Sequence, residues 1–303
     1  MERITERRST IGSGTSLATF LALLTCACGA RIDARAFGMP SMPGDTGETT
    51  AGELRLLTYN VAGLLDPISG SQPSVNHPLI SPKLNDHELV LMQEDFFYHQ
   101  ALAQEAEHPF QSQPDEAWQP WRPGDGLNRF SRYAPADHVR AAWTDCNGVL
   151  DQANDCLTDK GYSVSFTELA QGIYVDVYNL HMDAGGDAGD ISARAAQIDQ
   201  LLDVIAGRSA NRSLIVAGDT NLAAHREADQ RNLQRLLDGA GLVDACAALE
   251  CGDDRIDRVL LRSSTQLELE AITWEPAPGF EDSLGAPLSD HDPIAVRLAW
   301  RWR

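Results

Sequence analysis

The chain has 303 residues, an apolar fraction of 43% and a formal net charge of −20. This length and apolar content suffice for one large domain or two small ones with a sizeable core. The acidic charge argues against a dedicated nucleic-acid binder, because it repels DNA and anionic membranes at long range. A zwitterionic lipid headgroup meets no such net repulsion.

The N-terminal segment has the features of an export signal. Arg3, Arg7 and Arg8 precede an apolar run over residues 17–28, which is too short to span a bilayer. We therefore expect residues 1–28 to be a signal peptide and residues 29–51, rich in Gly, Pro, Thr and Ser, to be a flexible linker. We therefore expect a secreted or periplasmic protein. The alternative is a protein that is anchored by a lipid on Cys28.

Four cysteines lie beyond this segment, and an even number in an exported protein suggests disulfides. We expect the pairs that are close in sequence, Cys146–Cys156 and Cys246–Cys251. Neither pair has the CxxC spacing or the neighbouring His pair of a zinc site.

Beyond residue 51, strand-like and helical patterns mix without strict alternation. They predict α/β layers with largely antiparallel sheets, in a single domain over residues 52–303. The expected strands cover residues 54–61, 88–93, 162–168, 172–180, 213–217, 256–261 and 294–299. The expected helices lie within 79–91, over 98–107, from Asp190 or Ser192 to about 206, and over 232–240, with a loop at 109–126.

Polar residues of the kind that hold a metal or a phosphate stand at the ends of these apolar runs, in TYN, QE, NLH, GDTN, RID and SDH. The residues are Asn60, Glu94, His181, Asp219, Asn221, Asp257, Asp290 and His291. Each of them alone is common in a surface turn. Because loops at strand ends converge in such folds, the set together predicts one site.

Glu94 stands at the end of a buried strand, where a carboxylate must be paired or bound to a cation. Mg²⁺ takes one or two carboxylates, waters and a substrate phosphate, and Asn60 could add a neutral oxygen. Asp290 is a further candidate metal ligand. The sequence therefore predicts a magnesium site.

The remaining residues suit the cleavage of a phosphate ester. Asp219 can orient or deprotonate a water, and Asn221 can donate its amide to a phosphoryl oxygen. His291 is the expected base, with Asp257 to orient its ring. His181 would bind a phosphoryl oxygen or support the leaving group. The chain has no P-loop and no GxSxG motif, which disfavours a nucleotide-driven motor and a serine hydrolase.

Over residues 54–298 these motifs resemble, in the same order, those of the endonuclease/exonuclease/phosphatase superfamily. The resemblance implies a four-layered α/β sandwich, with two mostly antiparallel sheets packed face to face and helices outside. It also implies Mg²⁺-dependent hydrolysis of phosphoesters by a catalytic domain over residues 52–303.

Within the superfamily the chain is most similar to the sphingomyelinase C branch, through the segment DCLTDKGYSVSF at residues 155–166. This similarity implies that Asp159 and Lys160 help to place the substrate phosphate. In one departure from the pattern, Arg258 stands where Tyr is frequent. Bacterial members carry exposed aromatic residues that bind membranes. The candidates here are Trp118 and Trp121, or Trp274 and Phe280.

The expected function is thus a secreted, Mg²⁺-dependent phosphodiesterase, a monomer that cuts a phospholipid headgroup ester at a membrane surface. The alternative is a secreted endonuclease of the deoxyribonuclease type with nucleic acid as its substrate, since the same residues serve both reactions. A non-catalytic binding module would have lost one or more site residues, and none is missing.

Overall fold

The computed structural model describes residues 49–114, 123–148, 155–252 and 255–303. The chain divides into a unit Met1–Phe37, which lies outside these residues, and a unit Gly38–Arg303. The expected signal peptide and most of the expected linker therefore stay predictions. In the part that is described, no helix is long and apolar enough to cross a membrane.

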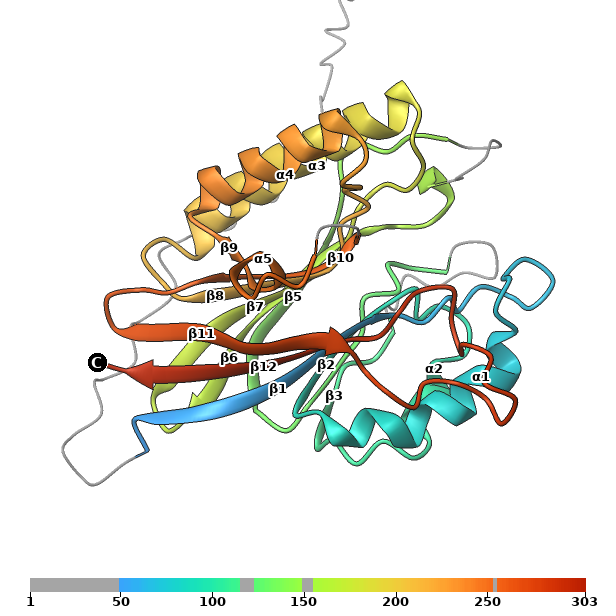
Figure 1. The fold of residues 1–303 in the computed structure, drawn as a ribbon, viewed down its shortest axis with the longest axis horizontal. Helices are drawn as coiled ribbons and strands as arrows, with labels where there is room; N and C mark the ends of the chain where they lie inside the picture. Colours follow the sequence, from blue (N-terminus) through green and yellow to red (C-terminus); the bar gives the residue numbers. More distant parts are fainter. Residues whose placement is uncertain (1–48, 115–122, 149–154, 253–254) are drawn as a thin grey trace, which may run out of the picture. The chain divides into compact units, whose positions relative to one another are not determined.

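Twelve described strands form two six-stranded sheets (Figure 1). The first sheet has the order β11-β12-β1-β2-β4-β3 and the second sheet has the order β5-β6-β7-β8-β10-β9. The bounds in the first sheet are β1 Ala51–Asn60, β2 Leu89–Gln93, β3 Phe110–Gln111, β4 Arg129–Ser131, β11 Leu267–Pro276 and β12 Ile294–Trp302. Those in the second sheet are β5 Pro135–Ala142, β6 Gly161–Ala170, β7 Ile173–His181, β8 Leu214–Asp219, β9 Val243–Asp244 and β10 Asp257–Arg262.

Each sheet contains one parallel pair among antiparallel neighbours. The parallel pairs are β1 with β2 in the first sheet and β7 with β8 in the second. The carboxyl ends of two parallel strands lie at the same edge of a sheet, so residues that follow them are neighbours. These two edges carry most of the polar strand-end residues.

Five of the described helices cover the outer faces: α1 Pro73–Ile80, η1 Ser81–Asp86, α2 His99–Ala103, α3 Ala188–Arg208 and α4 Glu227–Ala240. The other two that are described, the short helices η2 Asp155–Leu157 and α5 Ala245–Ala248, lie in connections between strands. A carboxylate caps α3, since Asp187 accepts hydrogen bonds from the amides of Gly189 and Asp190.

The alternation of side chains along the strands builds three apolar layers. Leu56 and Leu91 of the first sheet share a buried cluster with Val177 and Val259 of the second, which is the core between the sheets. The opposite face of the second sheet packs on α3 and α4, and that of the first sheet packs on α1, η1 and α2. The predicted four-layered sandwich with mostly antiparallel sheets is confirmed.

The expected elements differ from the observed ones in two ways. Every expected strand is present, but β3, β4, β5, β9 and β11 were not expected, and β3 lies within the expected loop 109–126. Helix α1 begins before the expected range 79–91 and ends at its second residue, η1 follows within that range, and α2 ends four residues before 107. Pro78 and the buried His77 lie inside α1 and interrupt its apolar periodicity. β5 is a half-exposed edge strand, so it lacks a buried stripe.

Both expected disulfides, Cys146–Cys156 and Cys246–Cys251, are present, with Cα atoms 5.4 and 5.2 Å apart. The first closes the loop between β5 and β6, and the second closes the loop after α5. Each bridge thus fixes one surface loop close to a strand that carries site residues.

Candidate active site

The predicted site residues meet where the two parallel strand pairs end. Asn60 is the last residue of β1, and Glu94 directly follows β2, its parallel neighbour. In the second sheet, His181 ends β7 opposite Asp219 at the end of β8, and Asp257 opens β10 opposite Asp219. The register of the strands, and not a long loop, therefore brings these three side chains of the second sheet side by side.

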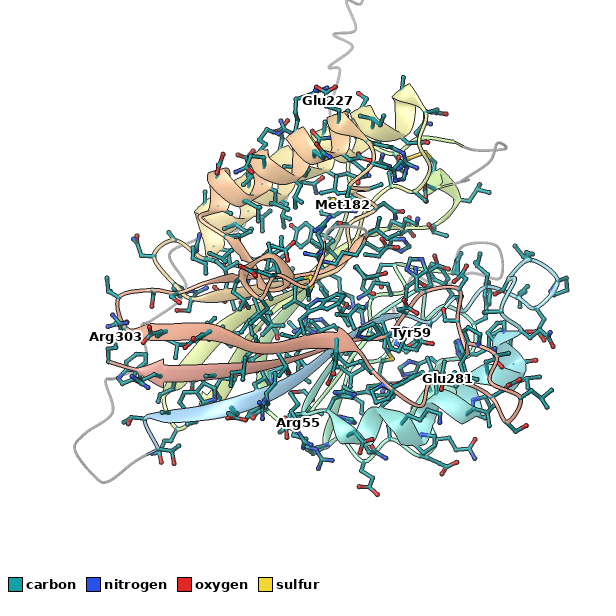
Figure 2. All side chains as sticks on the ribbon, viewed as in Figure 1. Arg55, Tyr59, Met182, Glu227, Glu281 and Arg303 are labelled. Atoms are coloured by element: carbon teal, nitrogen blue, oxygen red, sulfur yellow. A yellow bond between two sulfur atoms is a disulfide. The ribbon has the colours of Figure 1, made fainter. Side chains whose placement is uncertain are left out.

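Two labelled residues help to locate the site in Figure 2. Tyr59 immediately precedes Asn60 at the end of β1, and Met182 immediately follows His181 at the end of β7. The site lies between these two strand ends.

The amide of Asn60 links the two sheets. Its Nδ2 lies 3.2 Å from Glu94 Oε1, 3.3 Å from Asp219 Oδ2 and 3.5 Å from His291 Nε2. Its Oδ1 accepts a hydrogen bond of 3.1 Å from the amide of Ala62, which fixes the orientation of the group. Asn60 is buried, so its side chain holds carboxylates from both sheets at fixed separation.

His291 and Asp257 form an oriented pair. His291 Nδ1 lies 2.8 Å from Asp257 Oδ2, and His291 Nε2 faces Asp219 Oδ2 at 3.7 Å. Burial lowers the pKa of His291, but the bond to Asp257 and the charge of Asp219 outweigh it and raise the pKa to about 10. Burial and the charge of Asp219 raise the pKa of Asp257 to about 6. Asp257 thus fixes the orientation of the ring, and Nε2 points into the site.

Asp219 remains ionised at the centre of the site. Burial alone would raise its pKa, but the imidazoles of His181 and His291 hold that pKa well below its ordinary value. His181 Nε2 lies 3.3 Å from Asp219 Oδ2 and 4.0 Å from Glu94 Oε1. A buried carboxylate between two imidazoles is the arrangement expected of a group that orients water or stabilises an imidazolium.

The GDTN loop turns sharply after β8. Gly218 has φ 138°, and a Cβ there would lie 2.0 Å from the carbonyl oxygen of Leu180, so only glycine fits. Asn221 also has a positive φ, 51°. The backbone nitrogen of Asn221 donates to Asp219 Oδ1 at 3.0 Å, and its side-chain Nδ2 donates to the carbonyl of Met182 at 3.1 Å. The loop therefore places Asn221 beside the strand end that carries His181.

The donor set around Glu94 fits a hard divalent cation. Glu94 has φ 57°, and 22% of its side chain is exposed. Its polar contacts are with Asn60 and His181, and no lysine or arginine among the described residues pairs with it. Asp290 is exposed and accepts a hydrogen bond of 3.3 Å from Ser289. Carboxylate oxygens with room for water are the ligands that Mg²⁺ prefers.

A second group of possible ligand atoms lies deeper in the same site. One atom each from Asp219, Asp257 and His291 lie within 4.8 Å of one another. The residues present are thus compatible with one cation at Glu94 or with a cation closer to the imidazole.

Lys160 lies next to the site with a partner that the sequence did not indicate. Its Nζ pairs with Asp155, which is buried and whose Oδ2 accepts a 2.7 Å hydrogen bond from the amide of Ala184, in the loop after β7. The ammonium group of Lys160 helps to lower the pKa of Asp219. Asp159 is half-buried, and its backbone nitrogen donates to Gly124 O at 3.1 Å. The sequence signals for Asp155 are its position before the disulfide cysteine 156 and its place at the start of the segment 155–166.

The candidate membrane-binding aromatics need correction. Phe280 is buried and packs edge-on against Tyr59, with ring centroids 5.3 Å apart. Trp274 is half-buried against the core between the sheets, and the guanidinium of Arg255 lies over its ring. The prediction that this pair is exposed was wrong, because apolar packing covers both rings. Trp118 and Trp121 lie outside the described residues.

No family model matches the chain. A protein of Mycobacterium tuberculosis named "Sphingomyelinase" is 34% identical over 271 residues, which cover 82% of this chain and 53% of that protein. The chain thus spans about half the length of the curated relatives that it matches.

Solved structures share the fold at low sequence identity. Beta toxin from Staphylococcus aureus, in a variant with bound magnesium ions, has a TM-score of 0.61 and 16% identity, and the match covers 81% of this chain and 99% of that one. Sphingomyelinase C from Streptomyces griseocarneus has a TM-score of 0.58 and 16% identity over 81% of this chain and 99% of the other.

The sandwich and its converging strand ends define a protein of the endonuclease/exonuclease/phosphatase superfamily, to which the chain belongs. Within that superfamily it is a homologue of the mycobacterial sphingomyelinases.

Proposed function

We propose that the chain is an exported, Mg²⁺-dependent phosphodiesterase that hydrolyses the headgroup ester of sphingomyelin or a related phospholipid. The observation that carries this proposal is the His291–Asp257 pair facing Asp219, with Glu94 and Asn60 beside it. The homology to mycobacterial sphingomyelinases supports the choice of substrate class.

The chain's own residues supply the proton transfer. His291 Nε2 takes a proton from the water whose oxygen attacks phosphorus, while Asp257 holds the ring and Asp219 stabilises the imidazolium. The bond from phosphorus to the oxygen of the departing alcohol breaks, and that oxygen takes up a proton from solvent, which balances the proton that His291 has accepted. His181, Asn221 and Lys160 lie around the position of the phosphoryl group, with Asp159 as a further candidate contact.

Glu94 and Asp290 would hold a bound Mg²⁺, which supplies neutralisation of charge on the phosphoryl oxygens. Asn60, predicted as a further ligand, directs its Nδ2 and not its oxygen to Glu94, and therefore orients that carboxylate. In the metal-free protein His291 is largely protonated near neutral pH, since its pKa is raised to about 10. A cation beside Asn60 disfavours that proton because like charges repel. Occupation of the site therefore favours the neutral imidazole that accepts a proton.

Charge and exposed apolar side chains favour a lipid over a nucleic acid. The net charge of −20 opposes the binding of a polyanion. Leu284, in the loop between β11 and β12 that leads to His291, is 91% exposed, and Ile68, in the loop after β1, is 69% exposed. Exposed apolar residues in loops that lead to and from the site suit contact with a bilayer interface.

The test compares two substrates side by side. Purified protein is assayed with sphingomyelin liposomes and with plasmid DNA, in Mg²⁺ and in EDTA, with His291→Ala as the control for contaminating activity. We expect release of phosphocholine that needs Mg²⁺, without nicking of DNA. Nicking without release of phosphocholine would favour the nuclease, and activity that persists in EDTA would refute the metal requirement.

Export is part of the proposal. The two disulfides agree with an oxidising compartment. We expect the protein in the periplasm or the medium after cleavage of residues 1–28. Globomycin-sensitive processing, with lipid attached to Cys28, would identify the anchored form instead.

A further inference from the structure

Arg258 directly follows the site residue Asp257, yet it points to the opposite face of the second sheet. Val259 lies in the core between the sheets, whereas Leu260 lies in the cluster under α3 and α4. Because side chains alternate along a strand, Asp257 faces the site and Arg258 shares the outer face with Leu260. Arg258 is 3% exposed, so its charge requires partners.

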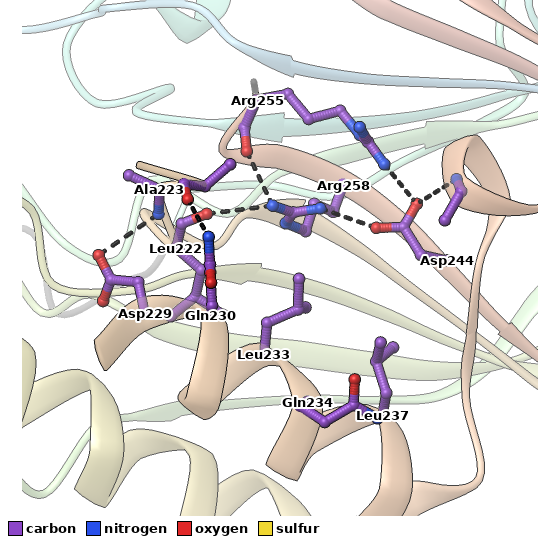
Figure 3. Close-up of a pocket in the computed structure, with 12 residues that line it drawn as sticks. Leu222, Ala223, Asp229, Gln230, Leu233, Gln234, Leu237, Asp244, Arg255 and Arg258 are labelled. Atoms are coloured by element: carbon purple, nitrogen blue, oxygen red, sulfur yellow. Dashed lines mark hydrogen bonds and ion pairs between the residues drawn. The ribbon is translucent and has the colours of Figure 1, made fainter. Parts of the chain in front are cut away.

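The guanidinium of Arg258 donates to two backbone carbonyls and one carboxylate, as Figure 3 shows. Nη1 donates to Asp244 Oδ2 at 2.8 Å, and Nη2 donates to the carbonyls of Leu222 at 3.1 Å and Arg255 at 2.9 Å. Leu222 is the residue after Asn221. Arg258 therefore holds the carbonyl next to the amide side chain that we place at the phosphoryl group.

Asp244 anchors this contact from the other side. Its carboxylate caps α5 through the amides of Cys246 and Ala247, and it also pairs with Arg255 at 2.9 Å. Burial raises the pKa of Asp244, but the two guanidinium groups outweigh this effect and lower it. The anchor therefore stays charged near neutral pH, in a segment closed by the disulfide of Cys246.

The buried side chain of Leu222 packs in the cluster under α3 and α4 and holds part of the loop on this side. A cavity of about 260 Å³ also adjoins Leu222, Ala223 and Ala224, and its other walls include Leu233 and Arg258. Beside this unfilled space, the hydrogen bonds of Arg258 add to the packing that positions the backbone. In addition, Asn221 has a positive φ, which persists only where surrounding contacts impose it.

We propose that Arg258 is a positioning residue for the reaction, which acts through Leu222 to hold Asn221 against the phosphoryl group. This inference rests on the proposed function for its kinetic part. A side chain with a single hydroxyl, such as tyrosine, could not donate to two carbonyls and a carboxylate at once.

Arg262 offers a matched control on the same strand and the same face. Its guanidinium also donates to backbone carbonyls, those of Arg212 at 3.2 Å and Ala240 at 2.8 Å. These lie at the other end of β10, away from the site. Arg258→Met and Arg262→Met therefore remove similar bonds at different distances from Asn221.

The kinetic test is a double-mutant cycle. Arg258→Met should lower kcat about tenfold or more with KM changed less than about twofold, while Arg262→Met leaves kcat near that of the wild type. In an Asn221→Ala background, Arg258→Met should cost no further activity, because the residue through which it acts is gone. Additive losses, or an equal loss of kcat in Arg262→Met, would overturn the proposal.

A second measurement does not depend on the substrate. Hydrogen exchange of backbone amides over residues 219–223 should be faster in Arg258→Met and unchanged in Arg262→Met. If Arg258→Met does not fold, Arg258→Lys keeps the charge beside Asp244 but cannot reach both carbonyls, and it should show the same change in exchange. Unchanged exchange would refute the positioning role, whereas a wild-type protein inactive on phosphodiesters would refute only the proposed function.

Discussion

The two sheets contribute to the candidate site in different ways. The second sheet supplies His181, Asp219 and Asp257 from register-paired strand ends, and the side chains of His181 and Asp219 are each 1% exposed. The first sheet supplies Glu94 from one residue beyond β2 and His291 from the loop before β12, with side chains 22% and 18% exposed. The second sheet thus provides a fixed electrostatic frame, and the first provides the more exposed groups, which in the proposed function would meet water, cation and substrate.

The largest expected effect comes from the frame. Asp219→Asn removes the charge that faces both imidazoles, and we expect kcat/KM on sphingomyelin to fall about 10³-fold. Initial rates measure the loss, and circular dichroism with thermal unfolding checks that the fold is retained. A variant that folds normally and keeps most of its turnover would show that the second sheet does not provide the frame.

Glu94→Gln should distinguish the role of the first sheet in binding the cation from the role of the second sheet. If Glu94 holds the cation, the Mg²⁺ concentration for half-maximal activity should rise at least about 10- to 100-fold, and high Mg²⁺ should restore part of the rate. Asp219→Asn should show no such recovery. Mg²⁺ titration of both variants after EDTA treatment makes the comparison, and identical titration curves would contradict the assignment of the cation to the first sheet.

The pH dependence of stability reports on the contact between the sheets. The folded state raises the pKa of His291 from 6.5 to about 10, so its stabilising effect is fully present below pH 6.5 and is lost as pH rises through about 10. Asp257→Asn should flatten this decline. Melting temperatures of both proteins in EDTA between pH 6 and 10 test the prediction, and parallel curves would exclude the pairing as its cause.

The smallest expected effect lies at the surface near the first sheet. Leu284→Ser should lower the rate on sphingomyelin vesicles about 3- to 10-fold, because part of the gain from burying one leucine is lost. The rate on a water-soluble phosphodiester should not change. Val243, 58% exposed at the edge of the second sheet, is the matched control, and Val243→Ser should leave both rates unchanged.

The sequence predicted most of the frame for a simple physical reason. His181 and Asp219 end buried apolar strands, where a polar residue is conspicuous, and the alternation within each strand indicates which face is buried. β11, with the pattern LELEAITW, carries the same alternating signal and could have been predicted from it. β5 could not, since its side chains are half-buried or exposed along the whole strand.

The supporting contacts could not be predicted, because they depend on tertiary placement. Nothing local indicates that Asp155 lies against Lys160, or that Arg258 reaches the carbonyl of Leu222. The same holds for Arg194, which is wholly buried and pairs with Asp229 on a different helix. A buried arginine has the same sequence signature as an exposed one.

One feature of the first sheet bears on how the protein is made. β1 pairs with β12 from Ala51 to Thr58, so Leu54 lies opposite Leu298, at the far end of the described chain. Contacts of such long separation slow folding and leave the middle of the sheet without a neighbour until the last strand has been synthesised. A chain still emerging from the ribosome or a translocation pore would therefore lack both this strand and His291. The proposed site would therefore be complete only after His291 and β12 had joined the sheet.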